Sequence, residues 1–130
     1  MAAQDLIVKE VNYVPSAYTN GNTVTIHKQA QYERIVAMSC EIQTAFNGTT
    51  PTLKAGDGTT TDLYMLTADI TAGTPGLYPG KGTATTGMAA MGGILATAAA
   101  GKDVVVTFGS GGSPTAGAAK FTITYYRERG

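Results

Sequence analysis

The sequence predicts an all-β protein, a single jelly-roll or β-sandwich domain (residues 1–130) of about eight antiparallel strands. Three observations support this fold class. Apolar and polar residues alternate in several segments, as expected for strands with one buried face. Abundant threonine and 17 glycines favour short strands and tight turns over helices. With 130 residues, the chain has room for one substantial core but not for two ordinary domains.

The N-terminal segment, residues 1–14, contains three consecutive apolar residues at positions 6–8. Such a run does not alternate as a one-sided strand should, so something must cover both of its faces. Two interpretations remain open: a first strand buried inside the sandwich, or an N-terminal arm that adds as an extra strand to a neighbouring subunit or another protein. The candidate interface residues in this part of the chain are Leu6, Ile7, Val8, Val11, Tyr13 and Tyr18.

Four further segments show clear alternation: residues 22–27, 34–46, 102–108 and 119–126. Their apolar positions predict a core made of Val24, Ile26, Val36, Met38, Cys40, Ile42, Val104, Val106, Phe121 and Ile123. Shorter apolar pieces at 6–8, 52–55, 63–66 and 94–96 lie between turn residues and complete the strand count.

Glycines mark the predicted turns. Asn47-Gly48 and the stretch Gly56-Asp57-Gly58 are expected to supply the positive φ angles that tight hairpins need. Residues 85–101 contain good helix formers but are interrupted by Gly87, Gly92 and Gly93, each of which costs up to about 1 kcal/mol relative to alanine in a helix. At most one short helical turn is expected there.

The motifs of catalysis and cofactor binding are missing from the sequence. Lys81 follows Gly80, but Pro75 stands where a phosphate-binding loop needs its first glycine. Asp57 and Asp62 fall short of the oxygen ligands of a calcium loop. We therefore expect no catalytic residue, no cofactor, no metal site and no enzymatic activity.

The histidine and the cysteine are both interpreted as structural. His27 has no second histidine with which to share a metal, so a structural role is favoured over that of a ligand or general base. Cys40 lies on the apolar face of the best strand, where a thiol behaves as a small hydrophobe rather than a nucleophile. As the single cysteine, it cannot form an internal disulfide, and an intracellular origin is expected.

Charge argues against nucleic acid and membranes as partners. Nine basic residues balance nine acidic ones, and charged residues make up 14% of the chain, against about 25% in typical domains. A signal peptide is not expected, because Asp5 and Lys9 frame an apolar run of only three residues. A transmembrane helix is not expected either, because the most apolar window, residues 87–100, is shorter than the roughly 20 residues needed to span a bilayer. A surface so low in charge, with seven tyrosines, predicts self-association as a dimer or trimer.

Two segments, TAFNGTTPTLKAGDG (44–58) and GSPTAGAAKFTITYYRERG (112–130), resemble a pattern of small jelly-roll proteins of tailed bacteriophages. The resemblance covers about a quarter of the chain and consists of turn chemistry. It implies a capsid decoration, or cement, protein that is made in the host cytoplasm and binds the major capsid protein on the outer surface of the virion. The alternatives are a tail or head-fibre component, or a carbohydrate-binding or receptor-binding module that uses tyrosines as aromatic platforms.

Overall fold

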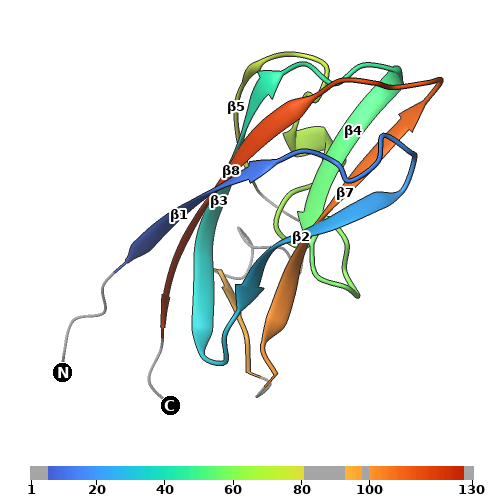
Figure 1. Ribbon diagram of the computed structural model, residues 1–130. Coiled ribbons are helices and arrows are strands. Elements are labelled where there is room, and N and C mark those ends of the chain that lie inside the picture. Colours follow the sequence, from blue (N-terminus) through green and yellow to red (C-terminus); the bar gives the residue numbers. More distant parts are fainter. Residues whose placement is uncertain (1–5, 81–92, 98–99, 128–130) are drawn as a thin grey trace.

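In the computed structural model, which describes residues 6–80, 93–97 and 100–127, the chain forms a sandwich of two antiparallel β-sheets (Figure 1). The described residues contain one helical element, the 3-10 helix η1 (Thr67–Asp69). The all-β prediction is confirmed, and the expected helical turn within 85–101 falls mostly outside the described residues. The strands are β1 (Ile7–Tyr13), β2 (Asn22–Gln29), β3 (Glu33–Thr44), β4 (Thr49–Gly56), β5 (Gly76–Pro79), β6 (Ile94–Leu95), β7 (Lys102–Gly111) and β8 (Ala118–Arg127).

The strand order is that of a jelly roll. The five-stranded sheet has the order β1-β8-β3-β5, with β6 also pairing with β3, and the three-stranded sheet has the order β2-β7-β4. Strands β1 to β4 alternate between the two sheets, and the last strand pairs with both the first and the third, which is the nested order of two Greek keys. Strand β1 therefore forms one edge of the five-stranded sheet, and β2 one edge of the other.

Two short elements differ from the sequence prediction. Residues 63–66, expected as a strand, form only a single bridge, between Ala55 and Met65, beside β4. Leu63, Tyr64 and Met65 are all buried, so this segment packs on every side instead of alternating. The sequence does not predict strand β5, because its four residues include a glycine and a proline. The strand forms by pairing with β3.

The core lies between the sheets and follows the predicted pattern with one shift of phase. Eight of the ten predicted core residues are buried: Ile26, Met38, Cys40, Ile42, Val104, Val106, Phe121 and Ile123. Val24 is partly buried against this core. Val36 is also only partly buried, because the β3–β8 pairing has a bulge between Ile35 and Ala37, and Ile35 points inward in its place.

A bulge in β2 reverses the faces of that strand. The pairing of β2 with β7 shifts between Thr25 and His27. Val24 faces the core before the shift, Ile26 is the extra residue at the shift and is buried, and after it His27 and Gln29 are the buried side chains. The bulge thus turns a histidine, rather than only aliphatic residues, toward the space between the sheets.

The two segments that carry the phage resemblance meet in space. The side-chain oxygen of Asn47 accepts hydrogen bonds from the backbone N–H groups of Thr115 and Ala116, at 2.8 and 3.0 Å. Gly117 has a φ of +145°, and a Cβ atom there would lie 2.2 Å from the Phe46 ring. The Asn-Gly and Pro-Thr-Ala-Gly motifs are therefore two halves of one packed corner.

The predicted hairpin glycines serve different purposes. Gly48 has the expected positive φ, +98°. Gly56 and Gly58 do not, so that part of the prediction is wrong. Gly56 is required by close approach, because a Cβ atom there would lie 2.1 Å from the Thr60 carbonyl oxygen. The turn that follows is closed by the Asp57 carboxylate, which accepts hydrogen bonds from the backbone N–H groups of Thr59 and Thr60.

Candidate interface on the five-stranded sheet

Strand β1 is an open edge with an apolar beginning. It pairs with β8 along its whole length, from Ile7 opposite Tyr125 to Tyr13 opposite Ala119. No strand among the described residues pairs with its other side, so backbone N–H and C=O groups face outward there and can accept another strand. The side chains of Leu6, Ile7 and Val8 are 61%, 48% and 63% exposed. Figure 1 shows this end of β1 extending away from the second sheet.

The other end of β1 is anchored in the sandwich. Tyr13 is 1% exposed, and its ring lies 5.7 Å from the ring of Phe121 and 6.3 Å from that of Phe46. Burial raises the pKa of the Tyr13 hydroxyl. Val11 packs against the same core. The strand therefore has a buried half and an exposed half.

The six candidate interface residues divide in the same way. Leu6, Ile7 and Val8 lie together on the surface. Tyr13 lies in the core, and Val11 is only partly exposed. Tyr18 follows β1; its hydroxyl donates a hydrogen bond to the Gly117 carbonyl at 3.0 Å, and its ring packs edge-on against Phe108. The surface available to a partner is thus residues 6–8, and the tyrosines hold the structure behind it.

The outer face of the five-stranded sheet continues from this edge. Val8 lies in one row with Thr124 and Ala37 across three strands. The next row crosses the sheet with Glu10, Thr122, Ser39 and Pro79. At the far edge, Leu77 lies opposite Glu41 and is 69% exposed. We call this surface, from residues 6–8 across β8 and β3 to β5, the outer face.

Charge on the outer face is largely neutralised in place. The Lys120 ammonium lies 2.9 Å from a carboxylate oxygen of Glu10 and 3.7 Å from one of Glu41. The hydrogen bond and the charge of Glu10 raise the pKa of Lys120. Beside these ions is a shallow groove of about 270 Å³, lined by Val36, Ala37, Met38, Ser39, Pro79, Gly80, Thr122 and Thr124. The small and aliphatic side chains of this groove cost little to remove from water, whereas its hydroxyl groups need hydrogen-bond partners in any contact.

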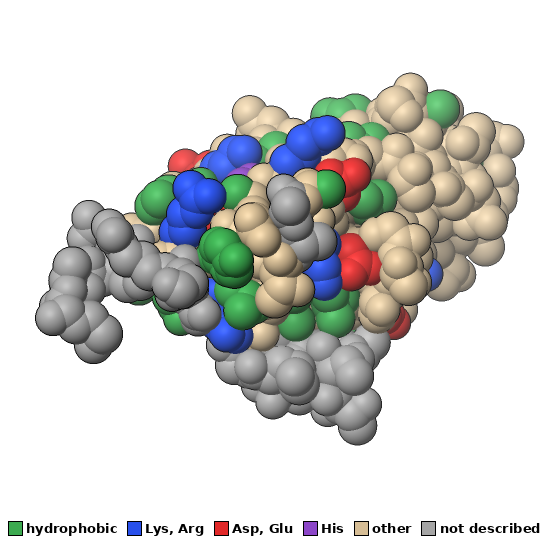
Figure 2. All heavy atoms as spheres, turned by 90° about the horizontal axis from the view of Figure 1, so that it is seen from below, with side chains coloured by type: hydrophobic (Ala, Val, Ile, Leu, Met, Phe, Trp, Pro, Cys, Tyr) green, Lys and Arg blue, Asp and Glu red, His purple; other side chains and the backbone are tan. Residues whose placement is uncertain are grey.

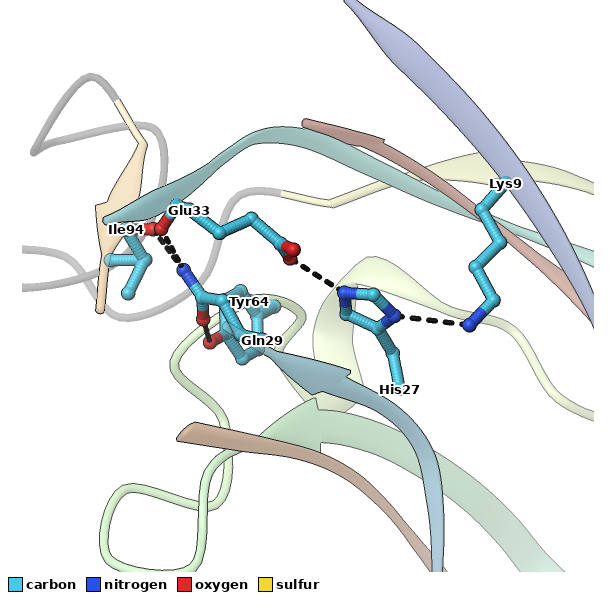
Figure 3. A network of polar contacts seen from close by, with 6 residues as sticks. All are labelled: Lys9, His27, Gln29, Glu33, Tyr64 and Ile94. Carbon is cyan, nitrogen blue, oxygen red and sulfur yellow. Dashed lines mark hydrogen bonds and ion pairs between the residues drawn. The ribbon is translucent and has the colours of Figure 1, made fainter. Parts of the chain in front are cut away.

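A polar cluster lies on the inner side of the same edge. In the space-filling view, the histidine lies among lysine or arginine side chains (Figure 2). In the close view, His27 lies between Lys9 and Glu33 (Figure 3), with Lys9 Nζ 3.1 Å from Nδ1 and Glu33 Oε2 2.6 Å from Nε2. An ammonium group can only donate, so Nδ1 accepts from Lys9 and Nε2 carries the proton donated to Glu33. Sequence reasoning found His27 but neither of its partners.

A second set of hydrogen bonds joins this cluster to the rest of the fold. The Gln29 amide nitrogen donates to the backbone carbonyls of Glu33 and Ile94, at 2.7 and 2.6 Å. The Tyr64 hydroxyl donates to the amide oxygen of Gln29 at 2.9 Å. Figure 3 shows these groups beside the backbone of Glu33, to the left of His27. The buried polar groups of Gln29, Glu33 and Tyr64 are therefore paired with one another or with backbone, as in a structural network.

Within residues 6–80, 93–97 and 100–127, no three His, Cys, Asp or Glu side chains come together as metal ligands. Cys40 is fully buried, and burial raises the pKa of its thiol to about 12, so it is not a nucleophile at neutral pH. No helix in the described part of the chain is long and apolar enough to span a membrane.

Six of the seven tyrosines, all of which lie in the described part of the chain, are buried or half-buried. Tyr13 and Tyr64 are buried, and Tyr18 and Tyr78 donate hydrogen bonds to backbone carbonyls. Tyr32, in the turn between β2 and β3, is the one tyrosine counted among the exposed side chains, at 39%. Stacking of a sugar ring needs exposed aromatic faces.

Comparison with known proteins places the fold among phage capsids. No family model and no curated protein matches the sequence. A chain of the cyanophage Pam1 capsid asymmetric unit has a TM-score of 0.72 at 19% identity, covering 98% of this chain and 93% of that one. A chain of the Ralstonia phage GP4 capsid has a TM-score of 0.64 at 14% identity, covering 97% and 86%. A chain of the acidic stable capsid structure of Helicobacter pylori bacteriophage KHP30 has a TM-score of 0.60 at 11% identity, covering 95% of this chain and 93% of that one. Likeness at such low identity establishes the shared fold.

Proposed function

We propose that this chain is a non-enzymatic structural protein of a bacteriophage virion, which binds the outer surface of the mature capsid as a decoration protein. Its partner is the major capsid protein. The observation that carries the proposal is the outer face, which has little unpaired charge and ends in an open apolar strand edge. The fold supports it, because three phage capsid structures contain chains of the same architecture.

Binding at this face needs no chemistry. Complete burial of a leucine, isoleucine or valine side chain contributes about 1.5–3 kcal/mol, and those of residues 6–8 are about half exposed. Covering all three therefore contributes roughly 2.5–5 kcal/mol, to which strand pairing and the rest of the face add. A subunit that binds only the assembled shell stabilises the shell by mass action, and the effect is repeated at every copy.

The experiment uses capsids that lack the protein, incubated with purified chain and separated by sedimentation. Two matched variants place a lysine on the outer surface of opposite sheets: Val8→Lys on β1 and Val105→Lys on β7. We expect the unmodified chain and Val105→Lys to bind in hundreds of copies and to raise the temperature of capsid disruption. Val8→Lys should bind at least about tenfold more weakly, because it places a charge in a desolvated contact.

The copy number separates this role from its alternatives. Binding of only a handful of copies would identify a tail or head-fibre component. Failure of the unmodified chain to bind, or equal loss in the two variants, would contradict the decoration role and the use of the outer face. Self-association as a dimer or trimer is part of the proposal, and sedimentation velocity of the purified chain tests it.

A further inference from the structure

A cationic hollow lies between the edge strands of the two sheets. It measures about 420 Å³ and is lined by Lys9 of β1 and by Thr25, Ile26, His27 and Lys28 of β2. Two of these side chains are ammonium ions, and lysine or arginine side chains surround the histidine on this surface (Figure 2). The hollow opens beside the same strand edge that carries Leu6 and Val8.

The charges around the hollow leave Lys9 able to bind another group. The buried Glu33 carboxylate is already engaged by His27, and Tyr125 packs its ring 5.1 Å from the His27 ring. Lys28 lies opposite Asp103 in the β2–β7 register. Among the described residues, Lys9 has one hydrogen bond, to His27, and an ammonium group has three donors. An anionic group entering the hollow would therefore find donors and a positive charge.

Strand alternation determines which position of a partner reaches the hollow. Lys9 lies opposite the buried Ile123 and projects between the sheets, whereas Val8 lies opposite Thr124 on the outer face. A strand added along the open edge of β1 would follow the same alternation. Its side chain opposite Lys9 would point toward the hollow, and its neighbours on either side would lie on the outer face.

We propose that the β1 edge binds an extended segment of another protein in which an acidic residue stands between two apolar residues. The acidic carboxylate pairs with Lys9 at the hollow, and the apolar side chains pack beside Val8. This deepens the proposed function, because it states the chemistry of the capsid segment. The inference rests on the proposed decoration role only in naming the capsid protein as the chain that carries this segment.

The β1 strand of a second copy does not have this chemistry. The positions of β1 that face inward are Ile7, Lys9, Val11 and Tyr13, and none is acidic. Antiparallel pairing of two β1 strands that sets Lys9 opposite one of these positions therefore places an apolar residue or a second lysine there. Like charges opposite each other destabilise a strand pair. Charge complementarity thus favours a different chain as the occupant.

The test uses two blocked peptides, acetyl-TVTVEVTVT-amide and acetyl-TVTVKVTVT-amide, titrated into the full chain. Binding is followed by amide chemical shifts and hydrogen exchange. Amides of β1 should respond, and those of β5, the opposite edge of the sheet, should not. The glutamate peptide should bind about three- to tenfold more tightly than the lysine peptide, since the exchange converts an attractive cross-strand pair into a repulsive one.

Variants attribute the preference to Lys9. Lys9→Met should abolish it, Lys9→Arg should retain it, and Lys54→Met, on edge strand β4 of the other sheet, should leave it unchanged. Equal binding of the two peptides, a response at β5 or β4 instead of β1, or a preference that survives Lys9→Met would overturn the inference. So would dimers of the chain held together through β1. Capsid binding without peptide preference would reject the inference alone, and peptide preference without capsid binding would reject the decoration role alone.

Discussion

The two ends of β1 should respond very differently to truncation of a side chain. Tyr13→Ala removes a ring that is 1% exposed and lies between the rings of Phe121 and Phe46. Val8→Ala removes two methyl groups from a side chain that is 63% exposed. Both residues belong to the same seven-residue strand and the same pairing with β8, so the contrast isolates burial.

The expected magnitudes follow from that burial. Replacing a buried aromatic residue by alanine costs about 3–5 kcal/mol, whereas substitution at an exposed position changes stability by about 0.5 kcal/mol or less. A domain of this size has a total stability of about 5–15 kcal/mol, so Tyr13→Ala should leave the fold marginal. Val8→Ala should leave it essentially intact.

Urea unfolding followed by far-ultraviolet circular dichroism measures both effects. With a slope of about 2 kcal/mol per molar urea, the midpoint should fall by roughly 1.5–2.5 M for Tyr13→Ala and by less than about 0.3 M for Val8→Ala. A large shift for Val8→Ala would mean that the whole strand is buried. A shift below about 0.5 M for Tyr13→Ala would mean that residues 7–13 do not belong to the sandwich, as in a detached arm.

Three further outcomes are expected. Asn47→Ala should lower the free energy of unfolding by about 1–2 kcal/mol in the same urea assay, because its carboxamide bonds the backbone of Thr115 and Ala116, and a loss near zero would refute this role. Burial raises the pKa of Asp57, but hydrogen bonds from Thr60, Thr59 and Lys102 outweigh this effect and hold the pKa below its ordinary value. The contribution of Asp57 to the free energy of unfolding is therefore present above about pH 4 and is lost as pH falls through the folded-state pKa. Asp57→Asn should make stability measured from pH 5 downward fall less steeply, and an unchanged slope would contradict the assignment. The Cys40 thiol should resist alkylation by iodoacetamide at pH 8 in the folded chain and react in urea, and rapid reaction without urea would show that it is exposed.

The sequence predicts the long strands well because alternation is a local signal. The segments at 22–27, 34–46, 102–108 and 119–126 correspond to β2, β3, β7 and β8. What it does not predict depends on pairing between distant segments. The bulge at Val36 arises where β3 pairs with β8, and the residue type at that position does not predict it. Strand β5 has no strong pattern of its own and exists because β3 offers it an edge.

The candidate interface was predictable in its apolar part alone. Residues 6–8 stand out because three consecutive apolar side chains cannot all face one core. The hollow beside them requires that β1 and β2 be the edges of different sheets and that the bulge in β2 turn His27 inward. Without that inserted residue, His27 would alternate with Ile26 and face solvent, leaving Lys9 without its acceptor between the sheets. In the proposed interface the two parts therefore have separate physical roles: the apolar residues would favour any extended segment, and the cation held by His27 would select among such segments by charge.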